Sequence, residues 1–128
     1  MAYAKNNQSG QTLVVLLFFI MVGITITVAA MIILSANSLA AAKIQQGEVA
    51  RQEAEAGAEN AYVKLLRDPG YTGETLQIGE DSVVISVSGS TTKTIDSTAT
   101  SEGFVRKVEI TASYVNNVLT PISWGEVF

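Results

Sequence analysis

The stretch LVVLLFFIMVGITITVAAMIIL, residues 13–34, decides how this chain folds, because 22 consecutive residues carry no charged side chain. A bilayer core about 30 Å thick needs about 20 helical residues, so the stretch is long enough to cross it. In lipid the backbone must satisfy its own hydrogen bonds, which favours a helix in spite of the β-branched residues. A helix buried in a soluble core is the alternative, but the rest of the chain is too short to surround it. We therefore predict one transmembrane helix at residues 11–35.

The composition restricts the functions open to the chain. Eight basic and 12 acidic side chains give a net charge of −4, and no basic cluster predicts nucleic-acid binding. The chain has no cysteine and no histidine, which removes disulfides and the commonest zinc ligands and nucleophiles. Glu80 and Asp81 flank a predicted turn, but two adjacent acids fall far short of a calcium-binding loop. We therefore predict no metal, no cofactor and no enzymatic activity.

The orientation of the predicted span follows from the order of the segments. Lys5 precedes the apolar stretch, whereas Lys43 and Arg51 follow it, so the count of flanking cations slightly favours the opposite direction. A short leader before a long apolar stretch is nevertheless the arrangement of a start-transfer signal, and we expect the C-terminal part to be exported. A cleaved secretory signal is the alternative, with small residues at 40–42. Its apolar region would be about 7–15 residues, shorter than this one.

The residues KNNQSG, followed by QTLVVLLFF, form a polar leader that ends at Gly10. This arrangement resembles the prepilin family, the type IV pilins and the pseudopilins of type II secretion. The resemblance implies that residues 1–10 are a leader, cut by a prepilin peptidase after Gly10 at the cytoplasmic face. Gln11 then becomes the N-methylated first mature residue, followed by Thr12 and Leu13, types that the family often has there. The alternative is that Gly10 only breaks the chain before an ordinary anchor helix.

Val15 departs from the family pattern. The family usually has a glutamate at this fifth mature position, where it pairs with the N-terminal amine of a neighbouring subunit. Because a carboxylate in lipid is costly and kept for function, its absence is informative. It makes the chain resemble minor pilins or tip-located pseudopilins. The family's mid-anchor proline is also missing, and residues 23–28 (GITITV) are poor helix formers in its place. We hypothesise that this stretch unwinds in a filament.

Residues 36–68 are predicted to continue the same helix outside the membrane. Ala, Glu, Gln, Lys and Leu dominate this segment, and no proline occurs before Pro69, where Asp68-Pro69-Gly70 ends the helix. Arg51 and Glu55 are four residues apart and are predicted to pair. The predicted buried face is a stripe at helical spacing, formed by Ala50, Ala54, Ala58, Ala61 and Leu65 and widened by Tyr62 and Leu66.

Residues 69–128 are rich in Thr, Ser, Val, Ile and Gly, which predicts an antiparallel sheet of four or five strands. We expect strands at 75–78, 82–88, 91–100, 106–115 and 119–127. Pro121 marks the last as an edge strand, and Asn116-Asn117 suits the turn before it. One face of the sheet should pack on the alanine-rich stripe, giving an α+β fold. We expect Trp124 in this core, with an exposed binding role as the alternative.

The resemblance implies a pilin-like structural subunit, a minor pilin or pseudopilin, built into a type IV pilus or secretion pseudopilus after leader cleavage. The implied partners are the prepilin peptidase, other pilin subunits contacted through the apolar helix, an inner-membrane assembly platform and the lipid bilayer. The implied location is the cytoplasmic membrane, with the N-terminus inside, and then a filament at the cell surface. The alternative is a single-pass, membrane-anchored accessory protein whose exported β domain does not enter a filament.

Overall fold

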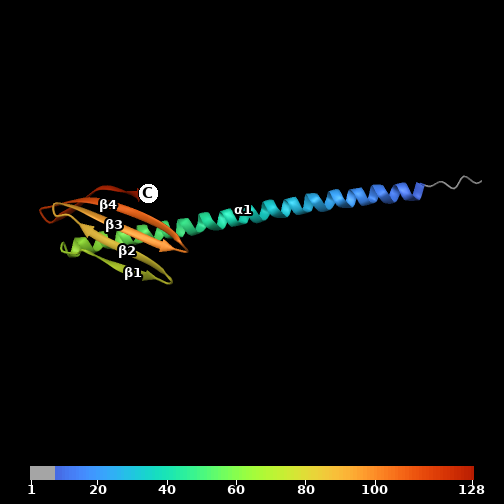
Figure 1. Cartoon of the computed structure of the whole chain (residues 1–128). Coiled ribbons are helices and arrows are strands. Elements are labelled where there is room, and N and C mark those ends of the chain that lie inside the picture. Colours follow the sequence, from blue (N-terminus) through green and yellow to red (C-terminus); the bar gives the residue numbers. More distant parts are fainter. Residues whose placement is uncertain (1–7) are drawn as a thin grey trace, which may run out of the picture. The chain divides into compact units, whose positions relative to one another are not determined.

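The computed structural model describes residues 8–128, which form one helix and five strands (Figure 1). The elements are α1 (Gln8–Arg67), β1 (Gly73–Ile78), β2 (Asp81–Ser88), β3 (Thr92–Ser101), β4 (Phe104–Val115) and β5 (Val118–Val127). The chain divides into two compact units, Met1–Ala41 and Ala42–Phe128, and α1 contributes to both. The predicted α+β class is confirmed: a long N-terminal helix and an antiparallel sheet packed on its second half. Lys5 and most of the predicted leader lie outside the described residues.

The helix ends where the sequence predicted. The Asp68 N–H makes the last helical bond, to the Lys64 carbonyl at 2.8 Å, and Pro69 cannot continue the pattern. The Asp68 side chain then accepts the Gly70 N–H at 2.9 Å, and its carbonyl accepts the Tyr71 N–H at 3.1 Å. These bonds turn the chain from the helix toward β1.

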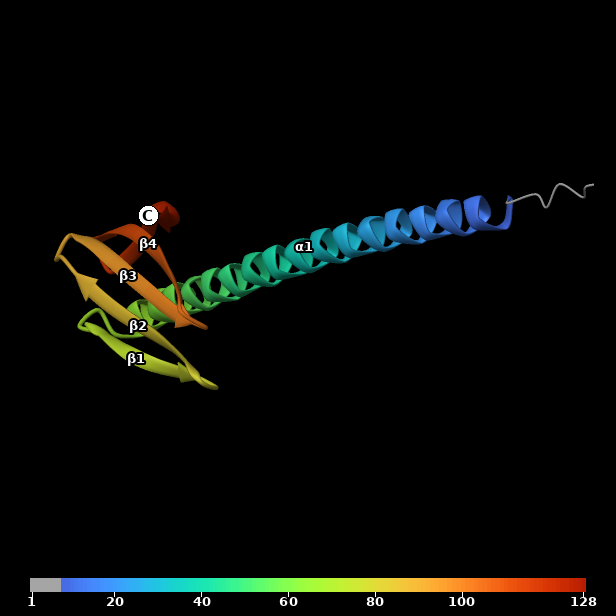
Figure 2. The ribbon, with the colours of Figure 1, turned by 45° about the vertical axis from the view of Figure 1, so that its right-hand side comes forward.

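The second half of α1 buries one face against the sheet (Figure 2). The predicted stripe is confirmed for its small residues and one leucine, which are almost fully buried: Ala50, Ala54, Ala58, Ala61 and Leu65. Tyr62 is half-buried at the margin, and its hydroxyl donates to the Leu119 carbonyl at 3.2 Å. The prediction was wrong for Leu66, which is 56% exposed. A residue next in sequence to the buried Leu65 is rotated about 100° around the helix, which takes it off the narrow contact face.

Gly57 allows the closest approach between α1 and the sheet. A Cβ atom at this position would lie 2.5 Å from Ser97 Oγ on β3 and 2.6 Å from Val83 Cγ1 on β2. Both distances are well inside van der Waals contact, so any side chain here would force the layers apart. The Ser97 hydroxyl is itself fully buried and has no hydrogen-bond partner among the described residues. The absence of a side chain at Gly57 therefore lets the helix pack directly against the sheet.

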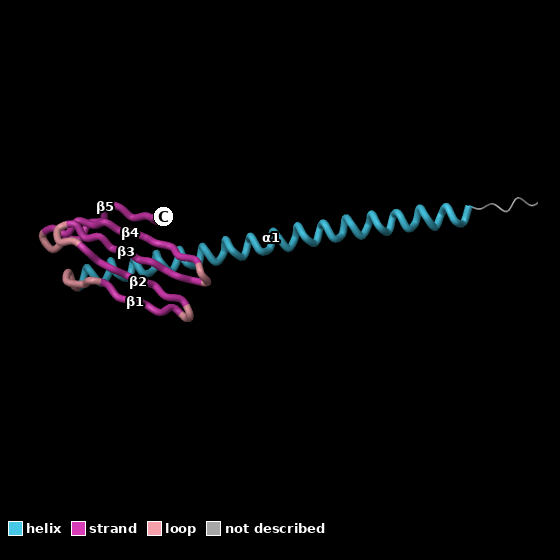
Figure 3. Tube along the Cα trace, in the orientation of Figure 1, coloured by secondary structure: helices cyan, strands magenta, loops and turns pink. Residues whose placement is uncertain are grey.

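The sheet is a simple meander in the order β1-β2-β3-β4-β5, with every neighbouring pair antiparallel (Figure 3). The predicted strands are confirmed, with ends that differ by about two residues. Asn116 and Asn117 form the β4–β5 turn with φ of 54° and 65°, the left-handed region that asparagine tolerates. The face toward α1 is apolar and buried, through Val83, Ile85, Ile95, Ala99, Val108, Ile110 and Ala112.

The expectation that Trp124 lies in the core was wrong, because its side chain is 44% exposed. Trp124 pairs across the sheet with Ile110, which is fully buried. Trp124 is exposed and Ile110 is buried because the helix does not cover the whole sheet. One helix is about 10–12 Å wide, whereas five strands about 4.8 Å apart form a wider layer. β5 is an edge strand that meets α1 only at the margin of the core, where the Trp124 and Tyr62 rings lie with their centroids 6.2 Å apart. Pro121 lies in β5, as predicted for an edge strand.

Overpacking at Gly57→Ala costs about 1–3 kcal/mol, and better helix propensity offsets about 1 kcal/mol of this, so the free energy of unfolding should fall by up to about 2 kcal/mol. Denaturant unfolding of the full chain in detergent micelles, followed by the fluorescence of Trp124, measures the change. Gly47→Ala is the matched control on the same helix face. A Cβ there meets nothing nearer than the end of the Arg106 side chain at 3.4 Å, so its stability should be unchanged or slightly higher. Equal effects of the two substitutions would contradict the close contact at Gly57.

Candidate functional site

The apolar segment of α1, residues 13–34, exposes apolar side chains along its whole length. Its bulky side chains point outward all around the helix, and those at its two ends, Leu13 and Leu34, are 69% and 68% exposed. Among the described residues, one helix is long and apolar enough to cross a membrane, and this segment lies near its N-terminus with none of it buried. Apolar surface in water costs about 25 cal/mol per Å². The segment therefore requires an apolar environment that its own chain does not provide.

Two threonines interrupt the apolar segment, and both satisfy their hydroxyl groups within the helix. Thr25 Oγ1 donates to the Met21 and Val22 carbonyls at 3.1 and 2.8 Å, and Thr27 Oγ1 donates to the Gly23 carbonyl at 2.8 Å. These bonds remove the cost of taking a bare hydroxyl into lipid. Residues 23–28 are helical in this structure. Their unwinding in a filament stays a prediction about the assembled state.

The predicted processing residues all lie in the first two turns of α1. Gly10, Gln11, Leu13 and Val15 are exposed, and a Cβ at Gly10 would have no atom of the described residues within 4 Å. Nothing in the fold of residues 8–128 therefore requires glycine at this position. Glycine weakens a helix by about 1 kcal/mol relative to alanine, which lowers the cost of opening the first turn. The geometry is compatible with access by a peptidase, and cleavage after Gly10 stays a prediction.

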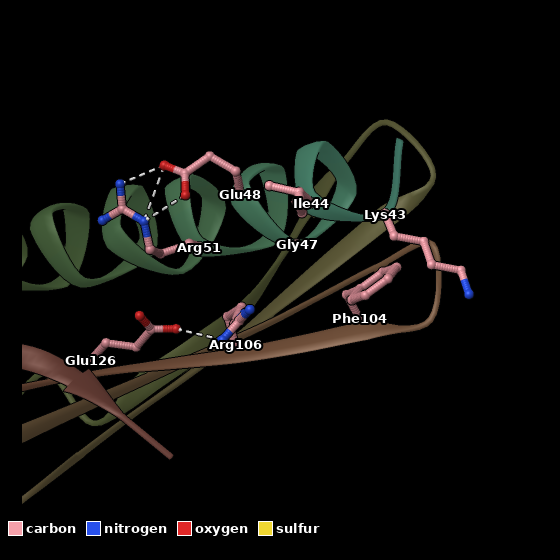
Figure 4. A pocket seen from close by; sticks show the side chains of 8 residues that line it. All are labelled: Lys43, Ile44, Gly47, Glu48, Arg51, Phe104, Arg106 and Glu126. Carbon is pink, nitrogen blue, oxygen red and sulfur yellow. Dashed lines mark hydrogen bonds and ion pairs between the residues drawn. The ribbon is translucent and has the colours of Figure 1, made fainter. Parts of the chain in front are cut away.

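A groove of about 400 Å³ lies between α1 and the strands β4 and β5 in the second unit (Figure 4). Four of its charged side chains, Glu48, Arg51, Arg106 and Glu126, form ion pairs. Arg51 Nη2 lies 2.6 Å from Glu48 Oε1, Arg51 Nη1 lies 3.2 Å from Glu55 Oε2, and Arg106 Nη1 lies 3.2 Å from Glu126 Oε1. The predicted pairing of Arg51 with Glu55 is confirmed. The groove is lined by Lys43, Ile44, Gly47, Glu48, Arg51, Phe104, Arg106 and Glu126.

The ion pairs in this groove make its ionisable groups less reactive. The hydrogen bonds from Arg51 hold the pKa of the Glu48 carboxyl below its usual value, and Glu48 in turn raises the pKa of Arg51. A carboxylate with a lowered pKa is a poor base, and a guanidinium with a raised pKa is a poor acid. The Arg51 pairs lie within α1 and the Arg106–Glu126 pair joins β4 to β5, so these ion pairs stabilise each layer separately and do not link the helix to the sheet.

The acidic side chains do not form a metal site within residues 8–128. No three of His, Cys, Asp and Glu lie together there as potential ligands. Glu80 is exposed in the turn between β1 and β2, whereas Asp81 faces inward and accepts a hydrogen bond from Ser101 Oγ at 2.8 Å. Sequence reasoning missed a further acid, Glu53, whose Oε2 atom is buried beneath the sheet. Glu53 was missed because it lies in a helical stretch rich in Ala and Glu, and such a stretch indicated that its acidic side chains face water.

Comparison with known proteins identified no relative of this chain. No protein-family model, curated protein or solved structure matches the chain. The functional argument therefore depends on the exposed apolar segment, the residues at its start and the α+β unit that follows.

Ile24→Arg places a charge near the middle of the apolar segment, where arginine costs about 2.5–3.5 kcal/mol on insertion scales. Alkaline extraction of membranes from expressing cells should release much more of this variant than of the unsubstituted chain. Ile44→Arg is the matched control: Ile44 is also an exposed isoleucine of α1, but it lies after the apolar segment. Its retention should equal that of the unsubstituted chain. Equal retention of all three proteins would contradict a span at residues 13–34.

Proposed function

We propose that the chain is a pilin-like structural subunit, a minor pilin or pseudopilin, that is held in the cytoplasmic membrane and then built into a filament. The observation that carries this proposal is the composition of α1. Its first half exposes apolar side chains on every side, and its second half packs a small sheet through an alanine-rich stripe. A bilayer satisfies the first half before assembly, and the apolar helices of neighbouring subunits satisfy it in the filament.

The proposed assembly begins at Gly10. Opening of the first helical turn extends the peptide between Gly10 and Gln11 at the membrane surface, where a prepilin peptidase hydrolyses it. The reaction frees the amine of Gln11, which is then methylated. Thr12 and Leu13 continue the helix into the apolar segment. An inner-membrane assembly platform then moves the subunit out of the bilayer, and its apolar helix packs beside those of other subunits.

Val15 supports a minor rather than a main subunit. At this place a carboxylate would neutralise the N-terminal amine of a neighbour, and a valine cannot. The Val15 side chain is half-exposed on the helix and, as a hydrocarbon, carries no group that could pair with an amine. A subunit at the tip of a filament does not need to neutralise the amine of a subunit above it, so valine costs nothing there.

The second unit suits the outer surface of a filament. On β3, the side chains that alternate with the buried core are mostly threonines, namely Thr92, Thr94, Thr98 and Thr100. Lys107 on β4 pairs with Asp96 between them, with Nζ and Oδ1 2.7 Å apart. A polar sheet face of this kind is stable in water, whereas the apolar helix is not. In the proposed function, the apolar half of α1 therefore lies in lipid or in the filament interior, and the sheet of the second unit faces water.

Mass spectrometry of the mature N-terminus tests the proposal, with the chain co-expressed with a prepilin peptidase. We expect a chain that begins at Gln11 with one added methyl group. Gly10→Leu should block processing, because a branched side chain hinders binding of the extended peptide. Gly23→Leu is the matched control, since a Cβ at Gly23 also has no atom within 4 Å. It should be processed normally. An intact leader, cleavage near Ala42, or normal processing of Gly10→Leu would contradict the proposal.

The second candidate is a single-pass, membrane-anchored accessory protein that stays out of filaments, and the valine at position 15 is the observation that favours it. Shearing of intact cells separates the two candidates. A filament subunit should appear in the sheared fraction in a small, constant ratio to a main pilin. An accessory protein should remain with the membranes after shearing, even where its N-terminus has been processed.

A further inference from the structure

β1 forms one edge of the sheet, and its backbone bonds to β2 use only one side of the strand. The Val87 N–H donates to the Thr72 carbonyl at 2.8 Å, and the two-residue turn between β1 and β2 sets the same alternation at the other end. In an antiparallel pair every second residue bonds to the neighbouring strand, and the residues between point their backbone groups away from it. The outward-facing backbone groups therefore belong to alternate residues of β1, namely Gly73, Thr75 and Gln77.

β1 lacks the features that usually protect an exposed strand edge from further pairing. Proteins commonly block such edges with proline, with lysine or with a β-bulge. The sequence of β1, GETLQI, contains no proline and no cation, and its six pairs with β2 run without a register shift. Its one charged residue, Glu74, lies on the α1 side of the sheet, where it pairs with Lys64 and accepts a bond from the Tyr71 hydroxyl at 3.0 Å. The free edge of β1 is therefore open to a further strand.

The opposite edge of the sheet, β5, carries two of these protective features. The turn before β5 has two residues, so the bonded positions alternate from Val118, and Pro121 falls between them. Its ring therefore occupies the free edge, where an N–H would otherwise face a further strand. A register shift between Thr111 and Ala112 also interrupts the pairing of β5 with β4. The two edges differ in this respect, and β1 is the one that can accept a strand.

The side chains at the β1 edge leave apolar surface for a neighbouring strand to cover. On the α1 side of the sheet, Leu76 packs against the core but is only partly buried. On the other side, the exposed Thr75 lies opposite Val84 of β2, which is 51% exposed. A strand added beside β1 would cover more of Leu76, and a long side chain on its outer face would reach across Thr75 to Val84. Burial of this surface adds to the backbone bonds.

We propose that the free edge of β1 binds an extended segment of a different filament subunit, which adds to the five-stranded sheet as a further strand. That the partner is a filament subunit rests on the proposed function, whereas the strand addition rests on β1 itself. The bonds formed join backbone N–H and C=O groups, so the partner segment has no proline opposite Gly73, Thr75 or Gln77. An apolar side chain beside Leu76 and a polar one beside Gln77 match the two faces of the sheet.

A second copy of this chain does not suit the β1 edge. Antiparallel pairing of β1 with β1 of a copy needs a two-fold axis perpendicular to the sheet, and this axis reverses residues 42–67 of α1 in the copy. Two chains held in one membrane, as proposed above, leave it in the same direction, so their helices are not reversed. Pairing of β1 with β5 of a copy is blocked by Pro121. The added strand therefore comes from a chain of different sequence.

Photo-crosslinking from β1, in the cells that make the full chain, tests the proposal. A diazirine amino acid replaces Thr75 or Gln77, and mass spectrometry identifies the crosslinked residue of the partner. We expect both probes to reach one segment of one other exported protein, at positions two residues apart, because paired strands advance in step. Thr120, an exposed threonine of β5, is the matched control position and should give no such crosslink. Crosslinks from Thr75 no more frequent than from Thr120, to a second copy of this chain, or to residues out of step would overturn the proposal.

Thr75→Pro separates strand addition from other contacts at this edge. The Thr75 N–H points away from β2, so its loss leaves the β1–β2 bonds in place but removes a donor from the free edge. Crosslinking from position 77 should fall about tenfold or more, because one carbonyl of the added strand loses its donor. Undiminished crosslinking in a Thr75→Pro chain that folds, as judged by Trp124 fluorescence, would overturn the proposal. If the variant fails to fold, the two-residue step seen with the probes alone still decides.

Shearing of the crosslinked cells distinguishes this inference from the proposed function. A processed chain that appears in filaments without crosslinks from β1 would contradict the strand addition alone. In-step crosslinks to a protein that remains with the membranes after shearing would support the strand addition and contradict the filament role. In-step crosslinks to a protein of the sheared fraction would support both.

Discussion

Inside a bilayer, residues 13–34 must satisfy their own backbone hydrogen bonds, because the hydrocarbon core holds no water to bond them. The α-helix is the structure that does this within one segment, and Thr25 and Thr27 return their hydroxyls to it. The same requirement explains why α1 begins before the apolar stretch and continues beyond it without a break. The helix carries two kinds of surface, one fully apolar and one polar with a single buried stripe. Each kind fits one of the two compact units.

The buried stripe of α1 packs closely on the sheet because its residues are small. Alanines and Gly57 contribute little apolar area themselves, but they let the helix backbone approach Val83 and Ile85 of β2, which belong to the same buried core. Close packing of this kind is sensitive to single methyl groups, because the interior is packed as densely as an organic crystal. The single helix also limits how much of the sheet is buried, since it covers the middle of the five strands and leaves an edge exposed.

The charged groups of the second unit differ in how they are solvated. Lys64 pairs with Glu74, Lys107 with Asp96, and these side chains remain about a third exposed, so they contribute little to stability. Tyr71, which donates to Glu74 at 3.0 Å, stays protonated because burial and then Glu74 raise its pKa to about 12. The Glu53 carboxyl differs from all of these, because its Oε2 atom is buried without a hydrogen-bond partner among the described residues.

The sequence by itself determined the features that depend on local pattern: the apolar segment, the end of α1 at Pro69, the alanine stripe and the alternation in each strand. The roles of Gly10, Gln11 and Val15 also came from the sequence and stay predictions, since these residues lie exposed on α1 where the described fold sets no requirement. The tertiary structure alone decided the exposure of Trp124, the close contact at Gly57 and the burial of Glu53. Periodicity shows which face of an element is apolar, but not how far a neighbouring element extends over that face. That coverage depends on the width of one helix relative to five strands, and only the folded chain sets it.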